Sequence, residues 1–157
     1  ISQIKPPQAT LVPDPPDNLT SDAGWDTIAN AQQLMELISE IKKLGVRISV
    51  FVDPDPRMVT GAKKCGADRI ELYTEPYATG FVIDREAAVK DYVIAAKEAQ
   101  NIGLGINAGH DLDLNNLQFL KKSIPFLDEV SIGHALICDA LYYGLENTIQ
   151  MYKRKLQ

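Results

Sequence analysis

Apolar and polar positions alternate with two periods along the chain, and these periods predict helices and strands in succession. Apolar residues recur every three or four positions from Ile28 to Leu44, which predicts a helix that Gly45 ends. A long Ala-rich helix is expected from the cap Asp84 to about Ile102. The helical face expected to be buried consists of Ile28, Ala31, Leu34, Met35, Ile38 and Ile41. Short apolar runs predict strands at Ala9–Val12, Val46–Val52, Arg69–Tyr73, Gly103–Gly109 and Glu129–Ile132.

Other helices are marked by their ends. Asp55 can cap free N–H groups and Pro56 has no N–H to lose, so a helix is expected from Pro56 to near Gly66. A helix of about ten residues is expected from Leu114, and helices cover Ala135 to the C terminus with a junction near Gly144.

Strands that alternate with helices of these lengths indicate parallel βαβ units and an α/β fold. Right-handed crossovers then yield either a closed barrel or an open doubly wound sheet. Five strands are too few for a barrel of eight. Residues 1–157 are expected to form a single domain, and the opening ISQIKPPQ, which has no initiating Met, suggests a fragment of a longer chain.

Composition excludes several classes of protein. A hydrophobic content of 45% in 157 residues is enough for a core, and no apolar run is long enough to span a bilayer. The net charge of -5 argues against a nucleic-acid surface. Without a signal peptide at its start, the chain is expected in the cytoplasm. Cys65 and Cys138 lie far apart and are expected to be reduced and buried.

The two histidines have matching contexts. His110 follows Asn107-Ala108-Gly109, and His134 follows Ile132-Gly133, each just past a predicted strand. The C-terminal ends of parallel strands carry the reactive groups in such folds, and the loops there commonly bind phosphate. Histidine also exchanges protons near neutral pH. The alternative is that both histidines only finish strands and bond to neighbouring carbonyl groups.

Glu71 lies within an apolar strand, on the face opposite to Ile70 and Leu72. In a barrel that face points inward, where an unpaired carboxylate is costly and is therefore a candidate for acid–base or electrostatic work. The alternative is a salt bridge from Arg69 to Glu71.

The segment from Pro13 to Asp26 is long for a βα connection and resembles a lid, in which Thr20 and Ser21 can reach a substrate oxygen. The same two residues could instead cap the next helix, and Trp25 could fix the loop to the surface. Asp53 is expected to serve a turn. No metal-ligand spacing, dinucleotide motif or nucleophile elbow is present, which disfavours metal and nucleotide enzymes.

The segments TLVPD, GVRISVFVDPDP, RIELYTEPYA, GINAGHDL and EVSIGHALICDALYYGL occur in the order and spacing of the pyridoxine 5′-phosphate synthase family, which the whole chain resembles. The resemblance implies a parallel (β/α)8 TIM-type barrel, of which this chain carries about the last five βα units. It also implies condensation of 1-deoxy-D-xylulose 5-phosphate with 3-amino-2-oxopropyl phosphate into pyridoxine 5′-phosphate, with no metal or organic cofactor. The partners implied are small phosphorylated substrates and further copies of the chain in a homo-oligomer.

By this resemblance His110 matches a proton donor and Glu71 a glutamate that stabilises charged intermediates. Gly133 and His134 match a phosphate-binding loop, and Thr20 matches a contact to the deoxyxylulose phosphate.

Three departures affect the implied site, and the first is Asp111, which stands where a phosphate-holding glycine is expected. Tyr73 and Glu75 replace a His and a Gly, and a Cys138-Asp139 pair replaces Gly-Arg. A histidine and a glutamate that act as proton acceptors belong to the family's N-terminal portion, so we expect this chain alone to be inactive.

Two other functions are compatible with the pattern. One is a non-catalytic module that binds sugar phosphates or assembles with another chain through its exposed strand edges. The other is a different barrel enzyme, such as an aldolase or isomerase. The aldolase is disfavoured because the lysines considered for a Schiff base all lie in predicted helices. They are Lys63, Lys64, Lys97, Lys121 and Lys122.

Overall fold

A computed structural model describes residues 1, 3–15 and 20–157, and within them five strands alternate with seven helices. The strands are β1 (Gln8–Leu11), β2 (Arg47–Val52), β3 (Arg69–Leu72), β4 (Gly105–Ala108) and β5 (Glu129–Val130). The helices are α1 (Ala31–Lys42), α2 (Pro56–Lys64), α3 (Glu75–Phe81), α4 (Arg85–Asn101), α5 (Leu117–Ser123), α6 (His134–Tyr143) and α7 (Leu145–Lys155).

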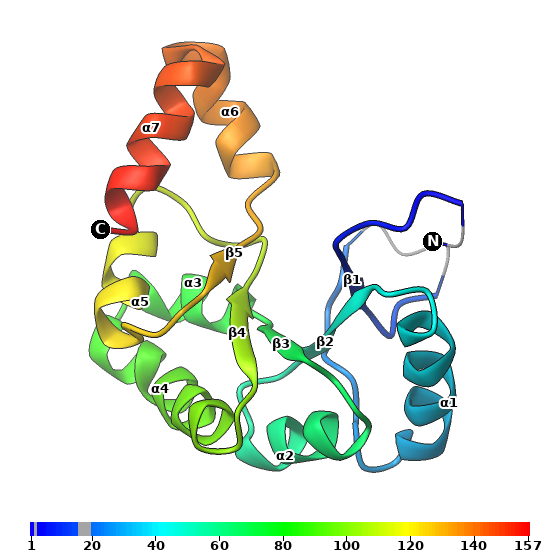
Figure 1. Ribbon diagram of the computed structural model, residues 1–157. Coiled ribbons are helices and arrows are strands. Elements are labelled where there is room, and N and C mark those ends of the chain that lie inside the picture. The colour runs from blue at the N-terminus through cyan, green and yellow to red at the C-terminus, as the bar shows by residue number, and fades with distance from the viewer. Residues whose placement is uncertain (2, 16–19) are drawn as a thin grey trace.

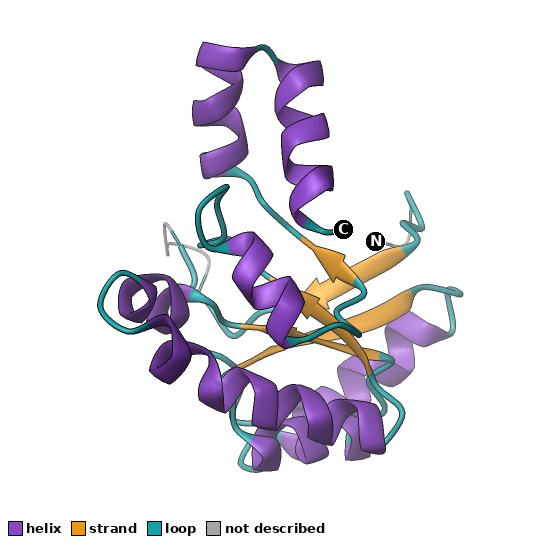
Figure 2. Cartoon of the chain, turned by 90° about the vertical axis from the view of Figure 1, so that its left-hand side faces the viewer, coloured by secondary structure: helices purple, strands orange, loops and turns teal. Residues whose placement is uncertain are grey.

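The five strands form one parallel sheet in the order β1-β2-β3-β4-β5, so each strand pairs with its neighbour in sequence. This order without reversal is that of a barrel and not of a doubly wound sheet. The sheet curls into part of a barrel, with α1, α2, α4 and α5 around its outer side (Figures 1 and 2). The predicted α/β fold with parallel βα units is confirmed.

The hydrophobic core lies between the outer face of the sheet and these helices. Ile48, Val50, Ile70, Leu72 and Ile106 are at most 1% exposed, and they alternate with residues that face the other side of the sheet. The helical residues packed in the same core include Leu34, Ile38, Val59, Ala95, Ala96, Leu117 and Leu120. Continuous burial along β2 and β3 is typical of parallel strands, which are covered on both faces.

The inner face of the sheet carries mostly polar residues, and we use this name for Gln8, Thr10, Arg47, Ser49, Phe51, Arg69, Glu71, Asn107 and Glu129. Near the N-terminal ends of the strands, hydrogen bonds between side chains of the inner face cross the sheet. Arg47 Nη2 donates to Glu129 Oε1 at 2.7 Å, and Arg47 Nε donates to Gln8 Oε1 at 2.8 Å. Residues of β1, β2 and β5 are thus in direct contact, which requires strong curvature of the sheet.

Several helix ends are as predicted, and others differ. Asp55 accepts a hydrogen bond from Arg57 N, and Asp84 accepts from Glu86 N and Ala87 N, which confirms both caps. Helix α1 begins at Ala31 and not at Ile28, because Asp26 accepts from the N–H groups of residues 28 and 29 and holds them in a preceding turn. Ile28 is therefore 60% exposed.

Two further helices differ from the prediction. Helix α3 was missed, although Pro76 near its start is the same kind of signal as Pro56. Helix α5 begins at Leu117 and not at Leu114, because Asp113 accepts from the backbone N–H groups of residues 115 and 116 in a turn. Tyr73 and residues 131–132 lie just outside β3 and β5.

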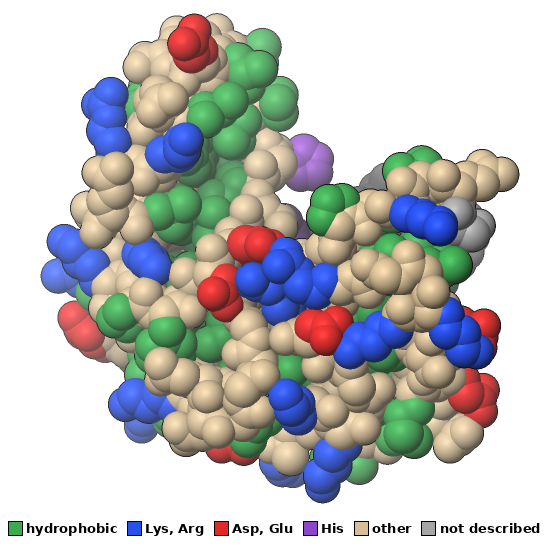
Figure 3. Space-filling model, viewed as in Figure 1, with side chains coloured by type: hydrophobic (Ala, Val, Ile, Leu, Met, Phe, Trp, Pro, Cys, Tyr) green, Lys and Arg blue, Asp and Glu red, His purple; other side chains and the backbone are tan. Residues whose placement is uncertain are grey.

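Helices α6 and α7 form a hairpin that stands away from the sheet (Figure 2). Helix α6 has no buried residue, and Figure 3 shows hydrophobic side chains gathered on this part of the surface. Leu141 is 81%, Tyr142 is 85% and Tyr143 is 53% exposed. Cys138, on the same helix, is exposed, whereas Cys65 is buried as predicted, and both are free thiols.

Candidate active site

The candidate site lies at the C-terminal ends of β3 and β4, where the structure brings Glu71 and the loop of His110 together. Glu71 is on the inner face of β3 and is 7% exposed. Its Oε2 accepts a hydrogen bond from Thr10 Oγ1 at 3.1 Å. A Cβ atom placed on Gly109 would lie 3.1 Å from Glu71 Oε1, so the glycine before His110 allows the backbone to pass over the carboxylate.

The charge of Glu71 is not neutralised by Arg69. Arg69 instead donates to Asn107 Oδ1 at 2.9 Å and lies 3.4 Å from Asp128 Oδ2, so the alternative of an Arg69–Glu71 salt bridge is wrong. Burial raises the pKa of Glu71, while the hydrogen bond from Thr10 and the charge of His110 act in the opposite direction. A buried carboxylate with a raised pKa can exchange protons nearer to neutral pH than an exposed one.

His110 follows Gly109 and has two aromatic neighbours. Its ring lies nearly parallel to that of Phe51, with the centroids 5.9 Å apart, and its centroid is 6.2 Å from that of Tyr73. The side chain of His110 is 31% exposed, so a ligand can reach it from one side. An imidazole held against aromatic rings and open on one side is suited to donating a proton to a bound molecule.

Asp111 is turned toward the protein. Its Oδ2 accepts a hydrogen bond from Thr74 Oγ1 at 3.2 Å and lies 3.5 Å from His110 Nε2. The N–H of Asp111 donates to Thr74 Oγ1 at 3.3 Å. One carboxylate oxygen and the backbone N–H of Asp111 are thus engaged with Thr74.

The segment 13–26 is fixed to the sheet at its C-terminal end. Trp25 N donates to Phe51 O at 2.8 Å, and Gly24 N donates to Asp53 Oδ1 at 3.2 Å. Trp25 also packs against the hydrophobic core, so it fixes the segment as expected. Asp53 takes part in the expected turn, where its carbonyl oxygen accepts from Asp55 N at 2.7 Å. Ser21 donates to Asp14, and Asp26 caps the turn before α1, so a capping role for Ser21 is wrong. Thr20 is exposed, and residues 16–19 of the predicted lid lie outside the described residues.

Gly133 and His134 lie at the start of α6, as the N-cap and the first helical residue. Both are exposed, and a Cβ atom on Gly133 would meet nothing within 4 Å. In the described part of the chain, no side-chain hydrogen bond joins them to Glu71, His110 or Asp111. The structure therefore brings Glu71, His110 and Asp111 together and leaves Thr20, Gly133 and His134 on the surface.

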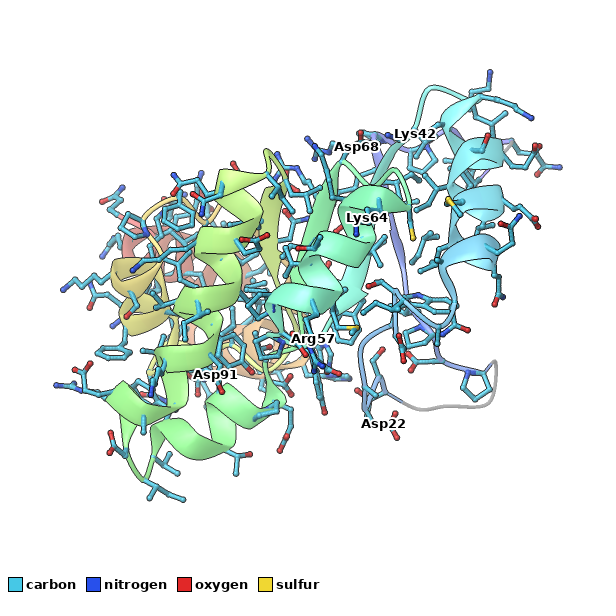
Figure 4. The ribbon with its side chains drawn as sticks, turned by 90° about the horizontal axis from the view of Figure 1, so that it is seen from below. Asp22, Lys42, Arg57, Lys64, Asp68 and Asp91 are labelled. Atoms are coloured by element: carbon cyan, nitrogen blue, oxygen red, sulfur yellow. The ribbon has the colours of Figure 1, made fainter. Side chains whose placement is uncertain are left out.

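A separate pocket of about 410 Å³ lies on the outer surface between α1 and α2. It is lined by Thr27, Ile28, Ala31, Arg57, Thr60, Gly61 and Lys64. Figure 4 shows Arg57 and Lys64 on α2, on the helical side of the sheet. Arg57 is paired with Asp55 at 2.6 Å, and the pocket shares no residue with the candidate site.

Comparison with known proteins decides the family. The sequence model described as pyridoxal phosphate biosynthesis protein PdxJ matches residues 1–157. The chain belongs to this family. It is 67% identical over 157 residues to the pyridoxine 5′-phosphate synthase of Cytophaga hutchinsonii, and 57% identical to that of Bacteroides thetaiotaomicron. Each match covers 100% of this chain, which spans 66% of the length of either relative.

A solved structure supports the fold of this PdxJ family member. A chain in the crystal structure of the Amycolatopsis orientalis BexX/CysO complex superimposes with a TM-score of 0.56 at 17% sequence identity. The match covers 89% of this chain and 52% of that chain. At this identity the similarity concerns the fold alone. None of the described helices is long and apolar enough to cross a membrane.

Two residues of the candidate site, Thr10 and Phe51, were missed at the sequence level, and Tyr73 was noted only as a departure from the family pattern. Thr10 contacts Glu71, and Phe51 and Tyr73 pack against the ring of His110. Alternation along β2 places Phe51 on the same face as Arg47, so its inward direction was predictable. The contact from Thr10 was not, because it crosses from β1 to β3 and depends on the curvature of the sheet. Within the described residues, His, Cys, Asp and Glu side chains form no group of three or more suited to a metal ion.

Proposed function

We propose that this chain is the catalytic C-terminal part of a pyridoxine 5′-phosphate synthase. The observation that carries this proposal is the 67% identity, over all 157 residues, to the Cytophaga hutchinsonii protein of that name. The proposed reaction joins 1-deoxy-D-xylulose 5-phosphate to 3-amino-2-oxopropyl phosphate, giving pyridoxine 5′-phosphate, phosphate and water. Residues 1–157 act as one unit in it and supply the last five βα units of an eight-unit barrel.

His110 is the proposed proton donor. It follows the C-terminal end of β4, the edge of the sheet at which ligands of βα barrels bind, and its aromatic neighbours limit rotation of its ring. A condensation of an amine with a ketone needs protons delivered to departing oxygen atoms, and a positioned imidazole is suited to this step.

Glu71 is proposed to stabilise positively charged intermediates, such as protonated imines. Its carboxylate is buried, and no Lys or Arg of the described residues forms an ion pair with it, so a cationic intermediate gains more from it than it would from an exposed carboxylate. The buried position also excludes water, which hydrolyses imines.

The proposed contacts to phosphate come from the surface elements of the site. Gly133 and His134 offer backbone N–H groups at the N terminus of α6, which favours an anion. Thr20 is proposed to contact the deoxyxylulose phosphate. Asp111 is proposed to act near the substrate through His110, since its carboxylate is 3.5 Å from His110 Nε2.

A homo-oligomer is proposed, because α6 exposes large apolar residues that a second copy can cover. Its substrates are charged phosphate esters, which supports a cytoplasmic location. Light scattering of the full-length protein tests the assembly, and a monomeric mass at micromolar concentration would contradict it.

The activity is tested by incubating the full-length protein with both phosphorylated substrates and measuring pyridoxine 5′-phosphate by chromatography. Product is expected with the wild-type protein, and Glu71→Gln and His110→Gln are each expected to reduce its rate of formation. A folded full-length protein that binds both phosphate esters and forms no product would overturn the proposal. That result would favour a binding module.

A further inference from the structure

The two oxygen atoms of the Glu71 carboxylate have different neighbours. Oε2 accepts a hydrogen bond from the hydroxyl of Thr10 on β1 at 3.1 Å. Oε1 lies on the side of Gly109, the residue before His110, close enough that an added Cβ atom would be 3.1 Å away. The carboxylate therefore spans from the first strand to the loop after the fourth, with Oε1 on the side of the candidate site.

We propose that Thr10 is a positioning residue for Glu71, whose hydroxyl holds Oε2 so that Oε1 faces the reacting centre. The inference rests on the proposed function only in assigning Glu71 a catalytic task. The contact between the two side chains does not depend on it.

Within the described residues, Thr10 is the one side chain that donates a hydrogen bond to Glu71. The nearby guanidinium groups are engaged elsewhere on the inner face. Arg47 contacts Gln8 and Glu129 at distances of 2.8 and 2.7 Å, and Arg69 contacts Asn107 at 2.9 Å. A carboxylate that is buried without a cation depends strongly on each remaining donor, because an unmade hydrogen bond leaves its charge without compensation.

The hydroxyl of Thr10 also affects protonation of Glu71. Burial raises the pKa of the carboxyl group, and the hydrogen bond from Thr10 opposes this rise. Removing the donor should therefore raise the pKa of Glu71 further and increase the protonated fraction at neutral pH. Thr10 thus keeps more of the enzyme in the charged form that stabilises a cationic intermediate.

The test compares three variants of the full-length protein. Thr10→Val removes the hydroxyl and keeps the shape, and Thr10→Ser retains the hydroxyl. Ser49→Ala is the matched control, because Ser49 is paired with Thr10 on the adjacent strand, is fully buried, and has no hydrogen-bond partner among the described side chains. Titration of Glu71 is followed by carbon NMR of labelled glutamate carboxyl groups, with Glu71→Gln assigning the signal.

In Thr10→Val, we expect Glu71 to titrate at higher pH and the acidic limb of the kcat profile to move in the same direction. A loss in kcat of about tenfold corresponds to one hydrogen bond to a charged group. Thr10→Ser should restore both values, and Ser49→Ala should leave both unchanged. If Thr10→Val does not fold, Thr10→Cys, a weak donor of similar volume, should show the same direction of change.

The outcomes separate this inference from the proposed function. An unchanged Glu71 titration in a folded Thr10→Val or Thr10→Cys variant would overturn the role of Thr10, whatever the activity of the wild-type protein. A shifted titration in a protein that forms no pyridoxine 5′-phosphate would keep the contact and its effect on protonation. It would reject the synthase and the catalytic purpose of the positioning.

Discussion

Arg47 on β2 and Glu129 on β5 are joined by a 2.7 Å hydrogen bond across the inner face of the sheet. Strands in a sheet are about 4.8 Å apart, so three steps on a flat sheet would separate β2 and β5 by about 14 Å. The contact between their side chains therefore depends on the curl of the sheet. It also supports that curl, because the same guanidinium binds Gln8 on β1.

Arg47→Met should destabilise the full-length protein by about 1 kcal/mol, since it removes hydrogen bonds from two half-exposed partners. Urea unfolding measures the change. The matched control is Lys43→Met, which removes an ion pair with Glu40 that is exposed on both sides. The control should change stability by less than about 0.5 kcal/mol, and equal effects of the two substitutions would contradict a special role for Arg47.

Glu71→Gln should make the protein more stable at neutral pH. Because the pKa of Glu71 is raised in the folded state, its contribution to stability is complete below the ordinary value of about 4.3 and is lost as pH rises through the raised value. Glutamine carries no charge and avoids that loss. Calorimetry at pH 4, 6 and 8 should show a Tm difference, variant minus wild type, that grows with pH.

Asp68→Asn supplies the opposite control for this pH dependence. Burial acts to raise the pKa of Asp68, but the hydrogen bond from Ile48 N and the ion pair with Lys42 outweigh it and lower the value (Figure 4). The stability from Asp68 is thus present at neutral pH and lost on acidification. Asp68→Asn should lower the Tm at pH 7 and have less effect near pH 3, the reverse of Glu71→Gln.

His110→Gln should lower kcat by about 100-fold or more, which is the usual contribution of a positioned general acid. The fold should persist, because the side chain is 31% exposed and its ring packs against Phe51 and Tyr73 at the edge of the core. Steady-state kinetics give kcat, and circular dichroism monitors folding. His134→Gln should act mainly on KM for the phosphorylated substrates, so a variant of His134 with a 100-fold loss in kcat and an unchanged KM would contradict these roles.

Gly109→Ala should lower both activity and stability, because the new Cβ atom would lie 3.1 Å from Glu71 Oε1 and displace the carboxylate. The expected loss of stability is about 1 kcal/mol. Gly133→Ala is the matched control, since its Cβ atom enters open space and its backbone N–H is retained. Thermal unfolding of both variants and the kcat of both provide the comparison. Equal losses in the two would show that the carboxylate contact has no influence.

The order of strands and helices was predictable because each element is marked by local signals. Apolar alternation identified β2 and β3, and the caps Asp55 and Asp84 identified the starts of α2 and α4. Helix α3 was missed because it has only seven residues and its apolar positions are interrupted by Gly80. The starts of α1 and α5 shifted because Asp and Asn side chains formed turns there, which periodicity does not detect.

Part of the candidate site was predictable from the positions of its residues on the strands. Glu71 and His110 follow from alternation and from their places at adjacent strand ends, and the register brings β3 and β4 together. The bond from Thr10 to Glu71 and the contact of Asp111 with Thr74 depend on side-chain direction between segments that are far apart in sequence. Sequence periodicity contains no information about such contacts. The exposed Cys138 was mispredicted because α6 stands outside the core.

The inner-face network also has a consequence for the order of events in folding. Gln8 Nε2 and Glu129 Oε2 are 3.5 Å apart and are separated by 121 positions in the chain. Contacts at this separation require closure of a long loop, whereas neighbouring βα units meet through short ones. The strands should therefore pair before the sheet attains its final curvature. Arg47→Met should then leave the rate of folding nearly unchanged and accelerate unfolding.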